Sequence, residues 1–132
     1  MTEQENNKKL VLEAFDAAFN RNEADAFERY WSPIYIQHSP RMAPGREGLI
    51  KANVSRPAEL HYEPGLIMAE GDYVMVHGRF TMGNKQRAVI TLDILRIENG
   101  LLAEHWDVME TEVRKEESKS GLPMFKHYFA TL

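Results

Sequence analysis

The period of the apolar positions changes near the middle of the chain. Along residues 10–19 they recur every three or four positions, at Leu10, Val11, Ala14, Phe15, Ala18 and Phe19. This spacing is typical of one buried helix face. Thr2-Glu3-Gln4-Glu5 has the capping-box spacing that favours a helix start there. A second, shorter helix is predicted after Asn22, with Ala26, Phe27, Tyr30 and Trp31 on its buried side.

The second half of the chain alternates with a period of two. Residues 66–69, 73–82, 87–97 and 101–111 are predicted strands, because turns rich in glycine and asparagine separate them. Residues 45–53 favour a third helix, and residues 35–38 favour a short strand or extended segment. Helices followed by an antiparallel meander predict an α+β fold, in which the helices pack on one face of a strongly bent sheet and leave a conical, apolar cavity.

The segment Asp93-Ile-Leu-Arg-Ile-Glu-Asn-Gly-Leu-Leu-Ala-Glu-His-Trp-Asp107 reads as two strands folded back on each other. A two-residue turn at Asn99-Gly100 would place Asp93 opposite Trp106. A three-residue loop at residues 98–100 would place Asp93 opposite His105. We favour the three-residue loop, because it separates a polar face from an apolar one. The polar face would hold Thr91, Asp93, Leu95, His105 and Asp107, and the apolar face Ile90, Leu92, Ile94, Leu102, Trp106 and Val108.

Two carboxylates on neighbouring strands of an apolar sheet are costly unless they are hydrated, paired or used. We therefore take Asp107 as the candidate proton-transfer group, with Asp93 and His105 beside it. A structural ion pair between Asp93 and Arg79 or Arg87 is the alternative. The side chains expected to bind a substrate in the same cavity are Tyr35, Gln37, His38, Thr91, Leu95 and Met42.

Composition excludes several other classes of site. The 132 residues include no cysteine, which excludes thiolate metal sites and disulfides. Asp93, His105 and Asp107 form a conceivable metal site, but no helical His-x-x-x-His pattern supports it, so we expect no metal and no cofactor. With a net charge of -4 and no basic stripe, we expect no nucleic-acid or membrane partner. We see no signal peptide or membrane span and expect a cytoplasmic protein.

Four groups of residues follow one another along the chain: Tyr35-Ile36-Gln37-His38-Ser39-Pro40; Gly45 and Gly48; Asp93-x-x-Arg96-Ile97-x-x-Gly100; and Glu104-His105-Trp106-Asp107. Together they resemble the SnoaL-like polyketide cyclase branch of the nuclear-transport-factor-like superfamily. The resemblance implies a cone-shaped α+β barrel with a deep apolar pocket, which is usually dimeric through the outer sheet face. It implies intramolecular aldol chemistry without metal or organic cofactor, with Asp107 at the position of the acid/base aspartate. The family's pocket histidine is replaced here by Asp93.

The function expected is that of a cofactor-independent acid/base enzyme on a small to medium apolar, carbonyl-bearing substrate, of the cyclase, isomerase or dehydratase type. The alternative is a non-catalytic ligand-binding or dimeric interaction module on the same fold. Residues 1–132 are expected to form one SnoaL-like domain, whose tail, residues 112–132, docks on the barrel or on a partner. A homodimer through the outer sheet face is the expected assembly.

Overall fold

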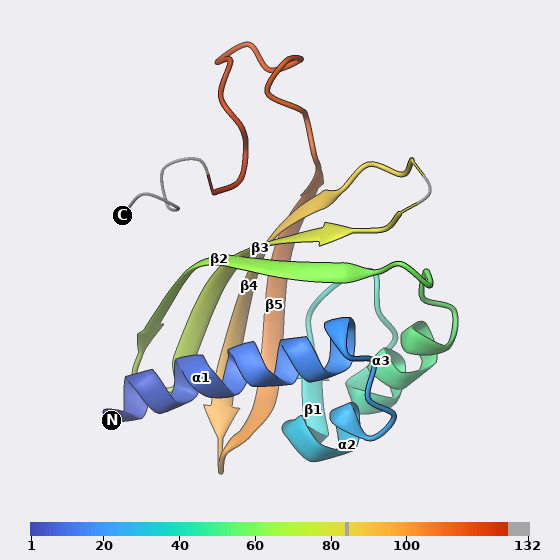
Figure 1. Cartoon of the computed structure of the whole chain (residues 1–132). Helices are drawn as coiled ribbons and strands as arrows, with labels where there is room; N and C mark the ends of the chain where they lie inside the picture. The colour runs from blue at the N-terminus through green and yellow to red at the C-terminus, as the bar shows by residue number, and fades with distance from the viewer. Residues whose placement is uncertain (84, 127–132) are drawn as a thin grey trace.

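Helices cover one face of a strongly curved sheet in the computed structural model, which describes residues 1–83 and 85–126 (Figure 1). Along the chain the elements are α1 (Glu3–Phe15), a π-helical turn η1 (Asp16–Asn20), α2 (Ala26–Tyr30), β1 (Trp31–Gln37), α3 (Gly45–Val54), β2 (His61–Glu70), β3 (Tyr73–Thr81), β4 (Val89–Glu98) and β5 (Leu101–Thr111). The predicted α+β class is confirmed. Among the described residues, no helix is long and apolar enough to cross a membrane.

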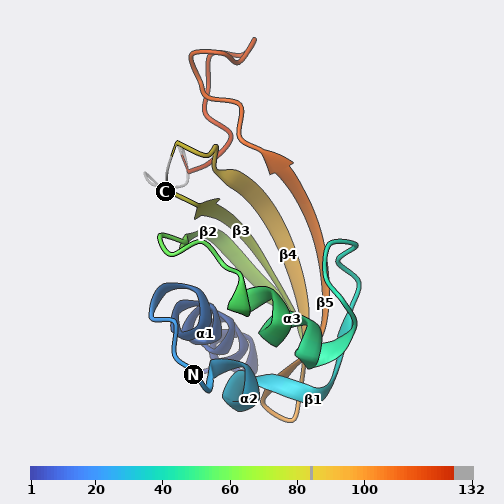
Figure 2. The same ribbon diagram turned by 90° about the vertical axis from the view of Figure 1, so that its right-hand side faces the viewer.

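The sheet has the order β1-β5-β4-β3-β2, in which only β1 runs parallel to its neighbour. It curls without closing, and the three helices lie on its concave side (Figure 2). The predicted capping box is present, because the Thr2 hydroxyl accepts from the Glu5 amide and the Glu5 carboxylate accepts from the Thr2 amide. The helical stripe and the concave sheet face share one core, which includes Val11, Ala14, Phe15, Val74, Val76, Leu95, Ile97 and Leu102.

The turn between β4 and β5 differs from the prediction. Asn99 and Gly100 both have positive φ, 54° and 74°, as a two-residue type I′ turn requires. Glu98 pairs with Leu101 and Ile97 with Leu102, so the predicted three-residue loop is wrong. Asn-Gly is the dipeptide that tolerates this conformation best, which is the physical reason for the tighter turn.

A β-bulge directly after the turn restores the predicted faces. The pairing skips Ala103, since Ile97 pairs with Leu102 whereas Arg96 pairs with Glu104. One extra residue on β5 reverses the alternation beyond it. Asp93 therefore lies opposite Asp107, and the predicted set of concave-face residues is correct although the predicted partners are not. Leu102 also turns into the core, and its assignment to the outer face is wrong.

The start of α3 packs tightly on the loop that precedes it. A Cβ atom at Gly48 would lie 2.0 Å from the Ala43 carbonyl oxygen, which is far inside van der Waals contact. We expect Gly48→Ala to lower the free energy of unfolding by about 1–3 kcal/mol, because the backbone must shift to admit the methyl group. Urea unfolding measures this, with Glu47→Ala as an exposed control on the same helix. An unchanged midpoint for Gly48→Ala would contradict the close packing.

The C-terminal segment returns to the outer face of the sheet. Arg79 holds Glu112 through two hydrogen bonds of 3.0 and 2.9 Å. The Phe125 ring packs against Gly65 and lies 5.3 Å from the His77 ring, on the face opposite the helices. Residues 112–126, the part of this segment that the structure describes, therefore cover part of β2 and β3 and do not line the cavity. The last part of the tail that we expected to dock, residues 127–132, lies outside the described residues.

Candidate functional site

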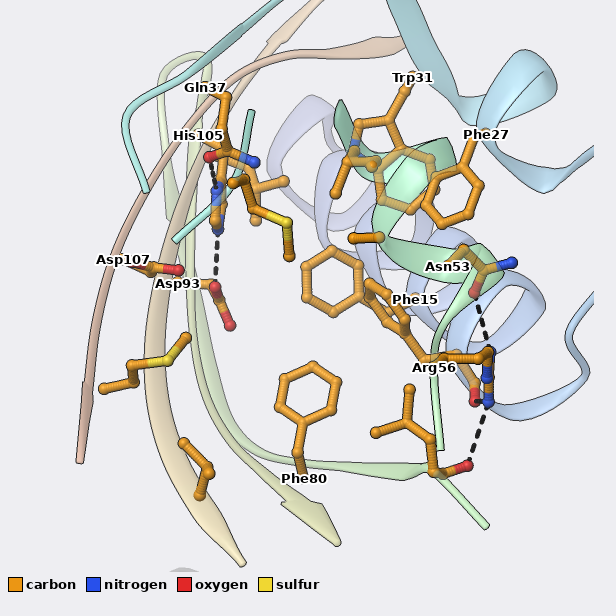
Figure 3. A pocket seen from close by; sticks show the side chains of 18 of the residues that line it. Phe15, Phe27, Trp31, Gln37, Asn53, Arg56, Phe80, Asp93, His105 and Asp107 are labelled. Carbon is orange, nitrogen blue, oxygen red and sulfur yellow. Dashed lines mark hydrogen bonds and ion pairs between the residues drawn. The ribbon is translucent and has the colours of Figure 1, made fainter. Parts of the chain in front are cut away.

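A cavity of about 310 Å³ lies between the helices and the concave face of the sheet (Figure 3). Its walls are mostly aromatic and aliphatic, and they include Phe15, Phe19, Phe27, Trp31, Leu49, Phe80, Leu95 and Met109. Polar side chains gather at two separate ends. Gln37, Asp93, His105 and Asp107 lie at one end, whereas Asn53, Ser55 and Arg56 lie at the other. A largely apolar ligand with polar groups near its ends matches this distribution.

Asp93 and His105 form a buried pair at the first polar end. The Nε2 atom of His105 lies 2.7 Å from Oδ1 of Asp93. The Thr91 hydroxyl donates to the other carboxylate oxygen of Asp93, Oδ2, at 3.1 Å. The Nδ1 atom of His105 lies 2.6 Å from Oε1 of Gln37, because the parallel register of β1 and β5 places these two residues side by side.

The backbone fixes the direction of these hydrogen bonds. The Ser39 amide donates to Oε1 of Gln37 at 3.1 Å, so this atom of Gln37 is the carbonyl oxygen. Nδ1 of His105 must then be the donor to Gln37. Nε2 is left facing Asp93 at 2.7 Å, and one proton lies between these two atoms in either of two arrangements: imidazolium with carboxylate, or imidazole with carboxylic acid.

Asp107 is buried as deeply as Asp93 but is bonded differently. Its side chain is 4 % exposed, and its Oδ1 atom is buried without accepting a hydrogen bond from the described residues. A guanidinium nitrogen of Arg41 lies 3.8 Å from this oxygen, beyond hydrogen-bond distance, and that side chain is half exposed. One carboxylate oxygen is therefore available for a ligand.

Tyr35 supplies a hydroxyl donor close to this group. Burial and the nearby charge of Asp93 raise the pKa of Tyr35, so it stays a neutral phenol. Its oxygen accepts from Gln37 at 3.1 Å. A phenol whose oxygen accepts a hydrogen bond still has its own proton to donate, and Tyr35 lines the cavity.

The cavity brings together seven of the nine predicted site residues: Asp93, His105, Asp107, Tyr35, Gln37, Leu95 and Met42. Thr91 is buried behind Asp93. His38 is not brought into the cavity, because strand alternation turns it outward. Its ring stacks on Trp106 at 4.7 Å, and its Nε2 lies 2.7 Å from a Glu104 oxygen.

Asp93 does not form the alternative ion pair with Arg79 or Arg87. Arg79 pairs with Glu112 and Arg87 pairs with Glu117, both outside the cavity. Two cavity-side arginines were missed by sequence reasoning. Arg41 approaches Asp107, and Arg56 lies at the far end. No local pattern marks either residue, because Asp107 lies far from Arg41 in the sequence, and Ala18 and Phe19 lie far from Arg56.

Arg56 holds the far end of the cavity in place. It donates to the Ala18 and Phe19 carbonyls at 2.9 and 2.6 Å and to the Leu60 carbonyl at 3.3 Å. The guanidinium therefore satisfies carbonyl groups that the end of the π-helical turn leaves without intrahelical partners. Burial lowers its pKa, and no carboxylate among the described residues pairs with it.

Comparisons with known proteins agree with this geometry. Solved structures with similar folds include TsrD from Streptomyces laurentii (26 % identity, TM-score 0.68, covering 83 % of this chain and 92 % of that one). A candidate ketosteroid isomerase from Kribbella flavida DSM 17836 is 17 % identical, with a TM-score of 0.71 and coverage of 86 % and 84 %. AclR, a candidate hydroxylase from Streptomyces galilaeus, is 24 % identical, with a TM-score of 0.69 and coverage of 83 % and 81 %.

The sequence comparison is more specific than the fold comparison. Among curated proteins, none matches the chain. The family model described as the SnoaL-like domain matches residues 11–105, from the second half of α1 to the histidine of the buried pair. This match covers most of the chain and most of the cavity wall. The chain therefore belongs to the SnoaL-like domain family.

Proposed function

We propose that this chain is a cofactor-independent acid/base enzyme that acts on a small to medium apolar molecule with a carbonyl group. The observation that carries the proposal is the pair of buried carboxylates in an apolar cavity. Asp93 is bonded to His105 and Thr91, whereas Oδ1 of Asp107 has no hydrogen-bond donor among the residues that the structure describes. Two carboxyl groups with such different surroundings can take different roles in one proton-transfer reaction.

In the proposed reaction, Asp107 removes a proton from the carbon next to the carbonyl. The C–H bond breaks, its electron pair moves toward the carbonyl oxygen, and an enolate forms. The hydroxyl of Tyr35 donates to the developing oxyanion, which an apolar cavity makes more effective than it would be in water. A positioned carboxylate base of this kind contributes about 10²–10⁴-fold to the rate.

The pair of His105 and Asp93 supplies the second half of the reaction. Nε2 of His105 and Oδ1 of Asp93 lie 2.7 Å apart and share one proton. Both residues line the same end of the cavity as Asp107, so this proton can be transferred to the substrate bound there. Protonation of another carbon gives an isomerase, enolate attack on a second carbonyl gives a cyclase, and loss of a β-hydroxyl as water gives a dehydratase. The three outcomes share the same first step.

The first step can be measured without the natural substrate. We expect the chain to speed deuterium exchange at the acidic CH₂ of 2-tetralone in D₂O, followed by proton NMR. Binding of the probe is followed separately through the fluorescence of Trp31, which lines the cavity. Binding of the probe without accelerated exchange would contradict the proposed enzyme activity and favour a non-catalytic ligand-binding module.

We also propose a homodimer through the outer face of the sheet. This face exposes large apolar side chains that a monomer rarely leaves in one patch, among them Tyr73, Met75, Leu92 and Val108. Val108 is 72 % exposed near the centre of β5. A second copy of the same face would bury these side chains by two-fold symmetry.

We expect Val108→Glu to convert the dimer to a monomer in size-exclusion chromatography with light scattering, because it places two carboxylates in the interface. The matched control is Val54→Glu at the end of α3, where the valine is 84 % exposed and lies away from this face. If both variants keep the mass of the unmodified chain, the outer face is not the interface.

A further inference from the structure

We propose that Asp93, His105 and Asp107 form a binding site for one divalent transition-metal ion of the Zn²⁺ type. The ion would occupy the space between the three side chains, where a proton otherwise bridges His105 and Asp93. The site goes beyond the proposed function, which uses no metal, and it reverses the expectation drawn from the sequence. Binding of the ion does not depend on the proton transfer being correct.

The three possible ligand atoms already lie close together. One atom from each residue, a carboxylate oxygen or an imidazole nitrogen, lies within 4.8 Å of the other two. Zinc bonds to nitrogen and oxygen measure about 2.0–2.2 Å, so ligand atoms around one ion lie roughly 3–3.5 Å apart. The Asp93–His105 contact of 2.7 Å must open slightly, and Asp107 must approach.

Asp107 is the second observation that points to a ligand. Its Oδ1 atom is buried without a hydrogen-bond donor, and its side chain is only 4 % exposed. A buried carboxylate oxygen without a donor is costly, and a cation beside it removes that cost. The Arg41 guanidinium, which lies 3.8 Å away and is half exposed, removes only part of this cost. Rotation of Asp107 toward an ion breaks no hydrogen bond at this oxygen.

The imidazole is oriented as a metal ligand needs to be. Zinc-binding histidines donate one ring N–H to an oxygen of a neighbouring group, which fixes the ring and leaves the other nitrogen for the metal. Nδ1 of His105 donates to Gln37, and the Ser39 amide holds that carbonyl oxygen in place. Nε2 consequently faces Asp93 at 2.7 Å, and the three residues each offer a ligand atom within 4.8 Å of the other two.

A bound ion would act as an inhibitor of the proposed reaction. It would take the oxygen of Asp107 that removes the substrate proton and displace the proton that His105 and Asp93 return. This inhibition depends on the proposed function, whereas binding of the ion does not. Exchange into 2-tetralone by metal-free protein should therefore fall by at least about 10-fold when one equivalent of Zn²⁺ is bound, since the ion blocks the base.

Isothermal titration calorimetry with ZnCl₂ tests the site on the full chain after EDTA treatment and buffer exchange. We expect one ion per chain. Asp107→Asn should weaken binding by about 100-fold or more, and Gln37→Leu by about 10–100-fold through loss of the histidine's orientation. The matched control is His38→Gln, which removes a surface histidine whose glutamate partner also lies at 2.7 Å but which has no third ligand. It should leave binding unchanged.

The outcomes separate this site from the proposed function. Absence of one-to-one binding, or binding that Asp107→Asn does not weaken, overturns the metal site even if metal-free protein exchanges 2-tetralone. One-to-one binding that Asp107→Asn weakens supports the site even if no form of the protein exchanges the probe. Exchange that requires added Zn²⁺ also supports the site and overturns the cofactor-independent reaction.

Discussion

Asp107→Asn is expected to lower deuterium exchange into 2-tetralone by about 10²–10⁴-fold, because it removes the carboxylate that takes the proton. The thermal midpoint should stay level or rise. The substitution removes a buried charge whose Oδ1 atom accepts no hydrogen bond, and the ion pair lost with Arg41 is long and half exposed.

The exchange rate and the midpoint are measured on the same preparation by NMR and calorimetry. Asp72→Asn, which changes an exposed aspartate in the β2–β3 turn, is the charge-matched control and should leave both unchanged. A large loss of stability together with retained exchange would show that Asp107 is structural, and the proposed mechanism would then be wrong.

Asp93→Ala is expected to lower the free energy of unfolding by about 3–5 kcal/mol, the usual result of removing one member of a buried pair. The substitution leaves Nε2 of His105 without its partner and removes the acceptor of the Thr91 hydroxyl. Chemical denaturation measures the loss. The matched comparison is Asp107→Ala, at the residue directly opposite in the sheet and equally buried, which should cost far less.

A double-mutant cycle tests the cause of that loss. If the pair itself is responsible, Asp93→Leu and His105→Leu together should cost less than the sum of the two single changes, since an apolar pair leaves no unpaired polar group. Additive losses would mean that Asp93 stabilises the fold through something other than His105.

The fold was predictable because short stretches of the sequence carry the signals for its helices and strands. The stripe from Leu10 to Phe19 has one helical period, and the strands of the second half have a period of two. The capping box at Thr2 is an equally local signal. These features depend on neighbours within a few residues, so they can be recognised in the sequence without knowledge of the tertiary structure.

The placement of the site residues was predictable only in part. Asp93, His105 and Asp107 were expected on one face because of a three-residue loop, and they do share that face, but by a different route. The structure uses a two-residue turn and then a bulge at Ala103, which has the same effect on the alternation. Nothing in the sequence of β5 marks the bulge, because packing of both Leu102 and His105 toward the helices decides it.

Contacts between segments that are distant in sequence explain the other features of the site that were not predicted. The alternation of β1 turns Gln37 inward and His38 outward, and only the structure shows that the loop after it does not reverse this. Arg41 and Arg56 reach groups 66 and about 40 residues away, so local patterns cannot find them. The aromatic wall has the same origin, since it joins α1, α2 and β3.

The bulge at Ala103 makes the chemistry of this cavity depend on how one residue is accommodated in β5. If Ala103 took a regular place in the ladder opposite Arg96, every later residue of β5 would shift by one position and present its other face. The cavity would then receive Trp106 in place of His105 and Asp107, which would both face outward. Removal of Ala103 itself would keep Asp93 opposite Asp107, because the residues beyond it already pair as in a regular ladder. A shift of register at this one position therefore separates a cavity that holds these groups from one that lacks them.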